Sequence, residues 1–200
     1  MTRPIGDVCA RRAEGSAMAQ TVRRIVGPTI LCRSGAYFDF ENPEGSDFTI
    51  EDVAHGLAHI CRFNGHCQRF YSVAEHSVHV SSLVPFQYSY SALMHDAPEA
   101  FVGDIPKPLK AMLPDYRRIE ERVERAVLSR FNVSLPLHPC VKQADIAMLR
   151  AEQAQAMGNC DEWGGLEGVE PPMVLLGFWS PEEARARFID QFGRLAWGKR

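Results

Sequence analysis

The chain has 200 residues, of which 46% are hydrophobic and 24% charged. These shares are typical of globular proteins, so they exclude a disordered or a fibrous chain. Its 22 Lys and Arg against 25 Asp and Glu give a net charge of −3. We expect no nucleic-acid partner, because non-specific binding of nucleic acid depends on an excess of positive charge.

The cysteines and the N-terminal segment indicate where the protein works. The 6 cysteines form no C-x-x-C pair, and a chain of this length needs no disulfides, so we expect reduced thiols and a cytoplasmic location. Residues 1–17 have the composition of a disordered leader, and residues 18–200 are expected to form a single domain. No apolar export segment is visible near the start. Met173–Trp179, the strongest apolar stretch, is too short to cross a bilayer, so no membrane partner is expected.

The first predicted element is a small β-hairpin. Residues 28–40 place β-forming side chains on both sides of Ser34-Gly35, which is typical of two short strands joined by a turn. Residues 42–45 then combine Asn, Pro and Gly, which predicts a turn.

From Thr49 onward the pattern is helical. Thr49 with Asp52 three residues later resembles a capping box and predicts the start of a helix. Ser72 with Glu75 predicts the start of a second helix, which Pro85 ends.

Four more helices are predicted from helical periodicity and end signals. They cover about residues 89–100, 115–131, 141–157 and 181–197, the last with Phe188 and Leu195 on its core face and a stop at Gly198. Gly103–Pro108 is predicted to be a loop because of its prolines. The sequence therefore predicts an all-α, bundle-like domain of about six helices after a small hairpin.

Metal-binding side chains lie among apolar residues in three of these helices, at His76, at His95-Asp96 and at Asp145. A carboxylate on a helix face that should be buried is costly unless it is paired or bound to a cation. One divalent ion would satisfy all four side chains. Two imidazoles and two carboxylates suit Mn, Fe, Co, Ni or Zn better than Ca or Mg. The alternative is a buried polar network without a metal.

Glu99 lies one helical turn after His95. On the same helix face, it is placed to orient or deprotonate a water and to protonate a leaving oxygen. A metal beside it would lower the pKa of bound water and polarise a phosphoryl group. The alternative for Glu99 is a salt bridge at a helix end.

Five ordered sequence blocks within Ile50–Met157 resemble the HD superfamily of metal-dependent phosphohydrolases. The blocks are similar to the small bacterial 5′-deoxynucleotidases and to the related phage dATP triphosphohydrolases. They are Arg62-Phe63, Val73–Ser77, His95–Glu99, Gly103–Lys110 and Val141–Asp145.

The resemblance implies an HD-domain helical bundle and a role for each matching residue. The metal would be bound by His76, His95, Asp96 and Asp145. Glu99 would be the catalytic acid and base, and Asp104 would assist Glu99 or contact the sugar. Arg62 would hold the phosphate, with Lys107 and Lys110 as further phosphate ligands. The family commonly has Trp where this chain has Phe63. The change keeps a ring to pack against the sugar, but it puts strict selection against a ribose 2′-OH in doubt.

The reaction that this resemblance implies is hydrolysis of a deoxynucleoside 5′-monophosphate to a deoxynucleoside and phosphate, by a homodimer. The near alternative is a dNTP triphosphohydrolase that releases triphosphate. Further alternatives are a (p)ppGpp or cyclic-nucleotide phosphohydrolase and a catalytically retired ligand-binding module. The alternative for Arg62 is an ion pair with Glu75, and for Lys107 and Lys110 it is a solvated surface position.

Overall fold

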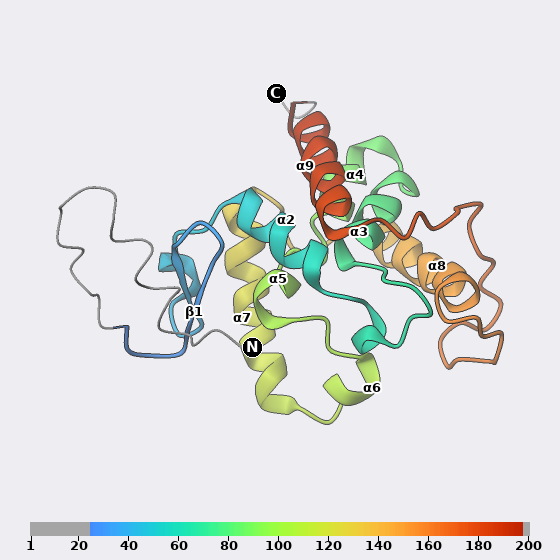
Figure 1. The fold of residues 1–200 in the computed structure, drawn as a ribbon, viewed down its shortest axis with the longest axis horizontal. Helices are drawn as coiled ribbons and strands as arrows, with labels where there is room; N and C mark the ends of the chain where they lie inside the picture. The colour runs from blue at the N-terminus through green and yellow to red at the C-terminus, as the bar shows by residue number, and fades with distance from the viewer. Residues whose placement is uncertain (1–24, 198–200) are drawn as a thin grey trace, which may run out of the picture.

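The computed structural model describes residues 25–197 (Figure 1). The predicted leader over residues 1–17 and the predicted helix stop at Gly198 lie outside this range. The described elements, in chain order, are β1 (Thr29–Leu31), β2 (Tyr37–Asp39), the 3-10 helix η1 (Pro43–Gly45), α2 (Ile50–His59), the 3-10 helix η2 (Phe63–Gly65), α3 (Val73–Ser82), α4 (Phe86–Leu93), α5 (Glu99–Val102), α6 (Lys107–Lys110), α7 (Pro114–Arg130), α8 (Pro139–Gln155) and α9 (Pro181–Trp197).

The fold class is the one that the sequence predicts, an all-α domain with one small hairpin. The described residues form eight α-helices instead of about six. The predicted helix over residues 89–100 is divided into α4 and α5 by a turn that ends at Pro98, because proline disfavours helical backbone at the residue before it. Within the predicted loop Gly103–Pro108, α6 begins at Lys107, where Pro108 occupies a first-turn position that needs no backbone donor.

The hairpin is attached to the helices through α2 and α5. Thr49 and Asp52 form the predicted capping box at the start of α2. The same Asp52 accepts a hydrogen bond of 2.8 Å from the backbone N–H of Ser34 in the hairpin turn. Phe38 of β2 is fully buried and stacks on Phe101 of α5 with ring centroids 4.0 Å apart. The strands are antiparallel, with Thr29 opposite Asp39, Ile30 opposite Phe38 and Leu31 opposite Tyr37.

The helices pack around α3. α2 lies against α9 and α5, while α3 lies against α4, α9 and α8 (Figure 1). Phe188 and Leu195 of α9 are buried in the larger apolar cluster, so the predicted core face of this helix is confirmed. A second cluster between α3 and α8 includes Val80 and Met148. These contacts fix α3 and α8, the two helices that supply His76 and Asp145 to the candidate site.

Two further features concern membrane-spanning helices and cysteines. None of the helices within residues 25–197 combines the length and the apolar character that a membrane span requires. The cysteines of the described part, which are Cys32, Cys61, Cys67, Cys140 and Cys160, are unpaired.

Candidate functional site

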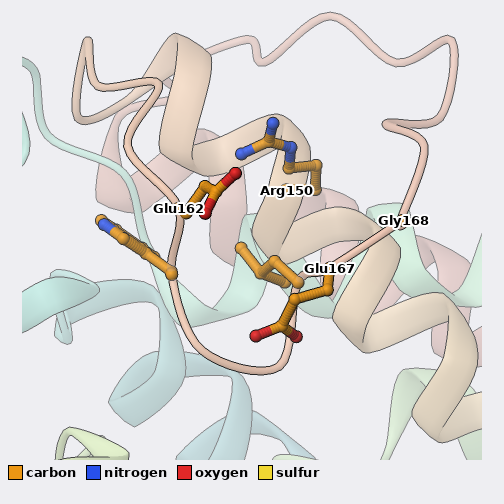
Figure 2. A pocket seen from close by; sticks show the side chains of 6 residues that line it. Arg150, Glu162, Glu167 and Gly168 are labelled. Atoms are coloured by element: carbon orange, nitrogen blue, oxygen red, sulfur yellow. The ribbon is translucent and has the colours of Figure 1, made fainter.

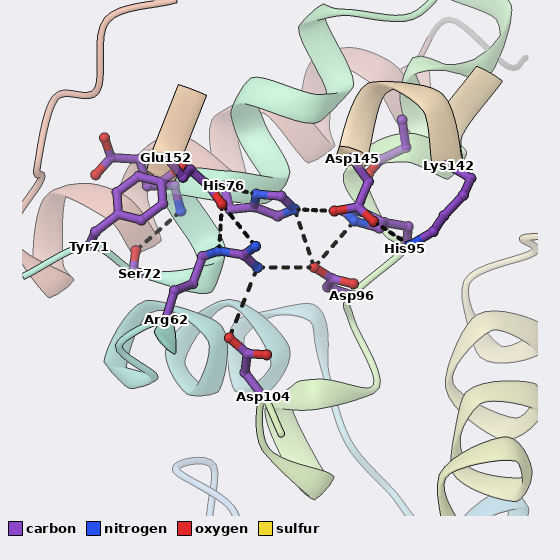
Figure 3. Close-up of polar contacts among 12 residues, drawn as sticks. Arg62, Tyr71, Ser72, His76, His95, Asp96, Asp104, Lys142, Asp145 and Glu152 are labelled. Atoms are coloured by element: carbon purple, nitrogen blue, oxygen red, sulfur yellow. Dashed lines mark hydrogen bonds and ion pairs between the residues drawn. The ribbon is translucent and has the colours of Figure 1, made fainter. Parts of the chain in front are cut away.

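Three of the four predicted metal ligands lie together. His76 of α3, His95 of the turn after α4 and Asp145 of α8 each offer one ligand atom, and these atoms lie within 4.8 Å of one another (Figure 3). Asp96 adjoins this group, because its Oδ2 lies 3.5 Å from Nε2 of His76 and 3.2 Å from Nε2 of His95. The fold therefore brings all four predicted ligands into one cluster, from segments far apart in the sequence.

Hydrogen bonds on the far sides of the two rings orient both imidazoles. Nδ1 of His76 lies 2.6 Å from a carboxylate oxygen of Glu152, and Nδ1 of His95 lies 2.7 Å from the carbonyl oxygen of Ala92. Both Nε2 atoms point into the cluster, where they are buried and make no hydrogen bond. Imidazoles held in this way by an outer partner are typical of metal ligands. The donor set of this chain therefore fits one divalent transition metal ion.

The charges in the cluster also fit a cation. Burial and the Arg62 charge favour a neutral imidazole, but Glu152 and Asp145 outweigh them and raise the pKa of His76 to about 9. Although burial opposes ionisation of Asp145, the adjacent His76 holds the pKa of this carboxyl below its usual range. The carboxylates thus favour a positive charge at this point, which a divalent ion can provide in place of a proton.

Arg62 is buried beside the candidate metal ligands and is held by a carboxylate that was not predicted from the sequence. Its Nε and Nη2 lie 3.2 and 2.9 Å from Oε2 of Glu152, a fully buried residue of α8. Tyr71 donates a further hydrogen bond of 2.8 Å to Oε1 of Glu152. Burial alone would raise the pKa of Glu152, but Arg62 and His76 lower it to about 2. Glu152 thus links the candidate phosphate ligand Arg62 to the candidate metal ligand His76.

The predicted alternative, in which Arg62 pairs with Glu75, is wrong. Glu75 is fully buried and its carboxylate accepts hydrogen bonds from three consecutive backbone N–H groups, those of residues 177–179. Glu152 was detectable in the sequence, because it follows Asp145 by seven residues and therefore lies on the same face of α8. An acidic residue on that face is predicted, like Asp145, to be paired or bound to a cation.

Asp104 lies on the opposite side of Arg62 from Glu152 (Figure 3), and Glu99 is near enough to Asp96 and Asp104 to be affected by their charges. Nη1 of Arg62 lies 4.0 Å from Asp104 and 3.9 Å from Asp96. Burial, together with the neighbouring carboxylates Asp96 and Asp104, raises the pKa of Glu99 well above its usual range. One carboxylate oxygen of Glu99 is buried without a hydrogen-bond partner. A carboxyl group that retains its proton here is suited to donate it to a leaving oxygen.

The remaining predicted substrate residues divide between two pockets. Phe63 and Lys107 line a cavity of about 580 Å³ together with Arg62 and Asp104. Lys110 does not reach this cavity. It pairs with Glu120 and lines a different pocket beside His95 and Glu99. The two lysines thus have different surroundings, and Lys107 is the one on the same cavity as Arg62.

Comparisons with known proteins place the chain among bacterial relatives. It is 38% identical over 166 residues to the protein YfdR of Escherichia coli (strain K12), an alignment that covers 82% of this chain and 93% of YfdR. The chain therefore belongs to the YfdR family. A Rhodobacter capsulatus protein is 34% identical over 174 residues, covering 78% of this chain and 89% of the relative. No family model matches the chain.

The relatives do not assign an activity to this YfdR-family protein. Both carry names that describe them as uncharacterized.

Proposed function

We propose that this protein is a metal-dependent nucleotide phosphohydrolase of the HD superfamily, which hydrolyses deoxynucleoside 5′-monophosphates to deoxynucleoside and phosphate. The observation that carries the proposal is the group formed by His76, His95 and Asp145, whose ligand atoms lie within 4.8 Å of one another beside the buried Arg62. Nucleotides are made and used in the cytoplasm, which is where we place the reaction.

His76, His95, Asp96 and Asp145 would hold the ion. When bound, a divalent transition metal lowers the pKa of a coordinated water and offsets phosphate charge. Arg62 would bind the phosphate oxygens, since its guanidinium presents several donors in a planar fork and Glu152 engages only Nε and Nη2. Glu99 would give its proton to the 5′-oxygen that leaves, and Asp104, which faces Arg62, would help to position the group.

The test uses the full chain. Its metal content is measured after purification, and the release of phosphate from dNMPs, NMPs and dNTPs is then followed with Mn²⁺, with Co²⁺ and after chelation. We expect metal-dependent release of phosphate from dNMPs, with the deoxynucleoside as the second product. Triphosphate as the product from dNTPs would favour the triphosphohydrolase instead. No metal-dependent hydrolysis of any nucleotide would overturn the proposal.

A matched pair of variants tests the site. Asp145→Asn removes a candidate ligand with little change in volume and is expected to abolish both bound metal and activity. Asp47→Asn alters an exposed aspartate that pairs with Arg130, and both quantities should then be retained. Full activity and metal content in Asp145→Asn would refute the assigned site.

A further inference from the structure

The cavity beside Arg62 has an apolar wall that the proposed reaction does not use. Its volume of about 580 Å³ lies within the range of about 300–1,000 Å³ that is usual for small-molecule sites. Its lining includes Arg62 and Asp104, which also belong to the polar cluster. Leu149 of α8 and Trp163 of the following loop form part of the rest. A ligand with one anionic and one apolar end would match this distribution.

Trp163 is held in place by the loop that carries it. Gln153 of α8 is fully buried, and its side-chain amide donates hydrogen bonds of 2.7 Å to the carbonyl of Asp161 and 3.0 Å to the side chain of Asn159. Beyond Trp163, the N–H of the buried Leu166 bonds to the Trp163 carbonyl at 3.0 Å. These bonds fix the backbone on both sides of Trp163 before any ligand arrives, which lowers the entropic cost of binding.

Phe63 lies beside Trp163 and has a strained backbone. Its φ is 54°, in the left-handed region that bulky residues rarely adopt, and such strain is concentrated at functional sites. The ring centroids of Phe63 and Trp163 lie 6.1 Å apart at 59°, so the two rings form a corner and not a slot. The guanidinium of Arg62 lies 5.5 Å from the Phe63 centroid. The corner thus adjoins the group that would bind phosphate.

A second pocket, of about 210 Å³, also borders Trp163 (Figure 2). Its lining includes Arg150, Glu162 and Glu167 but neither Arg62 nor Asp104. A ligand confined to this pocket would not contact Arg62, and Glu162 lines both pockets. The larger cavity is therefore the one that can hold the rest of a molecule whose phosphate lies at Arg62.

We propose that Trp163 is the platform on which the base of the nucleotide stacks while Arg62 holds its phosphate. This inference rests on the proposed function and specifies its substrate as a phosphate ester that carries a planar heterocycle. Stacking on an indole accepts every base, because each base has a π-face. The site would thus take purine and pyrimidine nucleotides and would discriminate against sugar phosphates without a base.

The experiment compares dAMP with 2-deoxyribose 5-phosphate, which lacks the base, in wild type, Trp163→Ala, Trp163→Phe and Met173→Ala. We expect Trp163→Ala to raise KM for dAMP about tenfold or more, with kcat little changed. The constants for deoxyribose 5-phosphate should not change, and Trp163→Phe should restore most of the affinity for dAMP. Met173 is fully exposed on the same connection, outside the cavity, and its variant should behave as wild type.

Two results would overturn the platform. One is an equal loss with both substrates in Trp163→Ala, which would indicate a general structural role. The other is no loss with either substrate. If the wild type hydrolyses no nucleotide, the proposed reaction fails, and the platform is then judged by calorimetric titration with dAMP. Binding that weakens in Trp163→Ala supports the platform, and absence of binding to the wild type overturns it.

Discussion

Nδ1 of His76 and Oε1 of Glu152 lie 2.6 Å apart in the fully buried centre of the molecule. The contact fixes the ring so that Nε2 faces His95 and Asp145, and the other Glu152 oxygen accepts from Arg62. One carboxylate therefore orients a candidate metal ligand and a candidate phosphate ligand together. This arrangement makes Glu152 a positioning residue for both halves of the site.

Glu152→Gln should weaken metal binding. The amide can still accept from Arg62 or face His76, but it cannot supply the charge that strengthens both contacts. We expect the affinity for Mn²⁺ or Co²⁺ to fall about 10- to 100-fold, as is typical for outer partners of metal-binding histidines. Calorimetric titration of the apoprotein measures this. Glu167→Gln, an exposed neighbour on the following loop, is the control, and equal affinities in the two variants would contradict the role of Glu152.

Arg62→Lys should impair substrate binding more than its retained charge suggests. A lysine cannot bond to Glu152 and phosphate with the same planar geometry. Loss of a charged hydrogen bond predicts a rise of about tenfold or more in KM for a dNMP. Lys107→Met removes an exposed charge from the same cavity and should raise KM by less, about fivefold at most. Steady-state kinetics decides, and a larger effect at Lys107 would reverse the assignment.

The sequence was most informative where a local pattern decides the structure. The cap at Thr49, the hairpin around Gly35 and the start of α9 at Pro181 each depend on a few adjacent residues, and each is present in the structure. The division of α4 from α5 was missed because the apolar pattern continues across the turn before Pro98. Local backbone chemistry outweighed the periodicity there.

Only those residues of the candidate site that have a local signature in the sequence were predicted. Charged residues on apolar helix faces identified His76 and Asp145. The partners of Glu75 were not accessible from the sequence, because they are backbone amides of a connection about a hundred residues later. Trp163 lies in the connection between α8 and α9, and its place beside Phe63 depends on how that connection packs against α8. Such long-range contacts have no local signature.

Glu75→Ala should destabilise the fold without touching the metal ligands. The variant leaves three backbone donors, on residues 177–179, without their acceptor. We expect the free energy of unfolding to fall by about 3 kcal/mol or more, since each unsatisfied donor costs about 1–3 kcal/mol and some regain water. Urea denaturation measures the change. Glu75→Gln keeps one acceptor oxygen and should lose less, and a stability equal to wild type in both variants would show that the connection is not held by Glu75.

Asp52 should make a pH-dependent contribution to stability. Burial alone would raise its pKa, but hydrogen bonds from Ser34 and Thr49 lower it below the usual value. A carboxyl whose pKa is lower in the folded than in the unfolded chain stabilises the fold above its unfolded pKa of about 3.9. That contribution is lost as the pH falls through the folded pKa.

Asp52→Ala should therefore lower the free energy of unfolding by about 1–2 kcal/mol at neutral pH, through loss of the hydrogen bonds that Asp52 accepts from Thr49 and Ser34. The difference from wild type should stay constant down to about pH 4 and narrow below it, because protonation of Asp52 weakens the same bonds in the wild type. Urea denaturation between pH 7 and pH 3 follows this difference. Glu51→Ala, at the exposed neighbouring position of α2, is the control. A difference that widens as the pH falls would contradict a lowered pKa for Asp52.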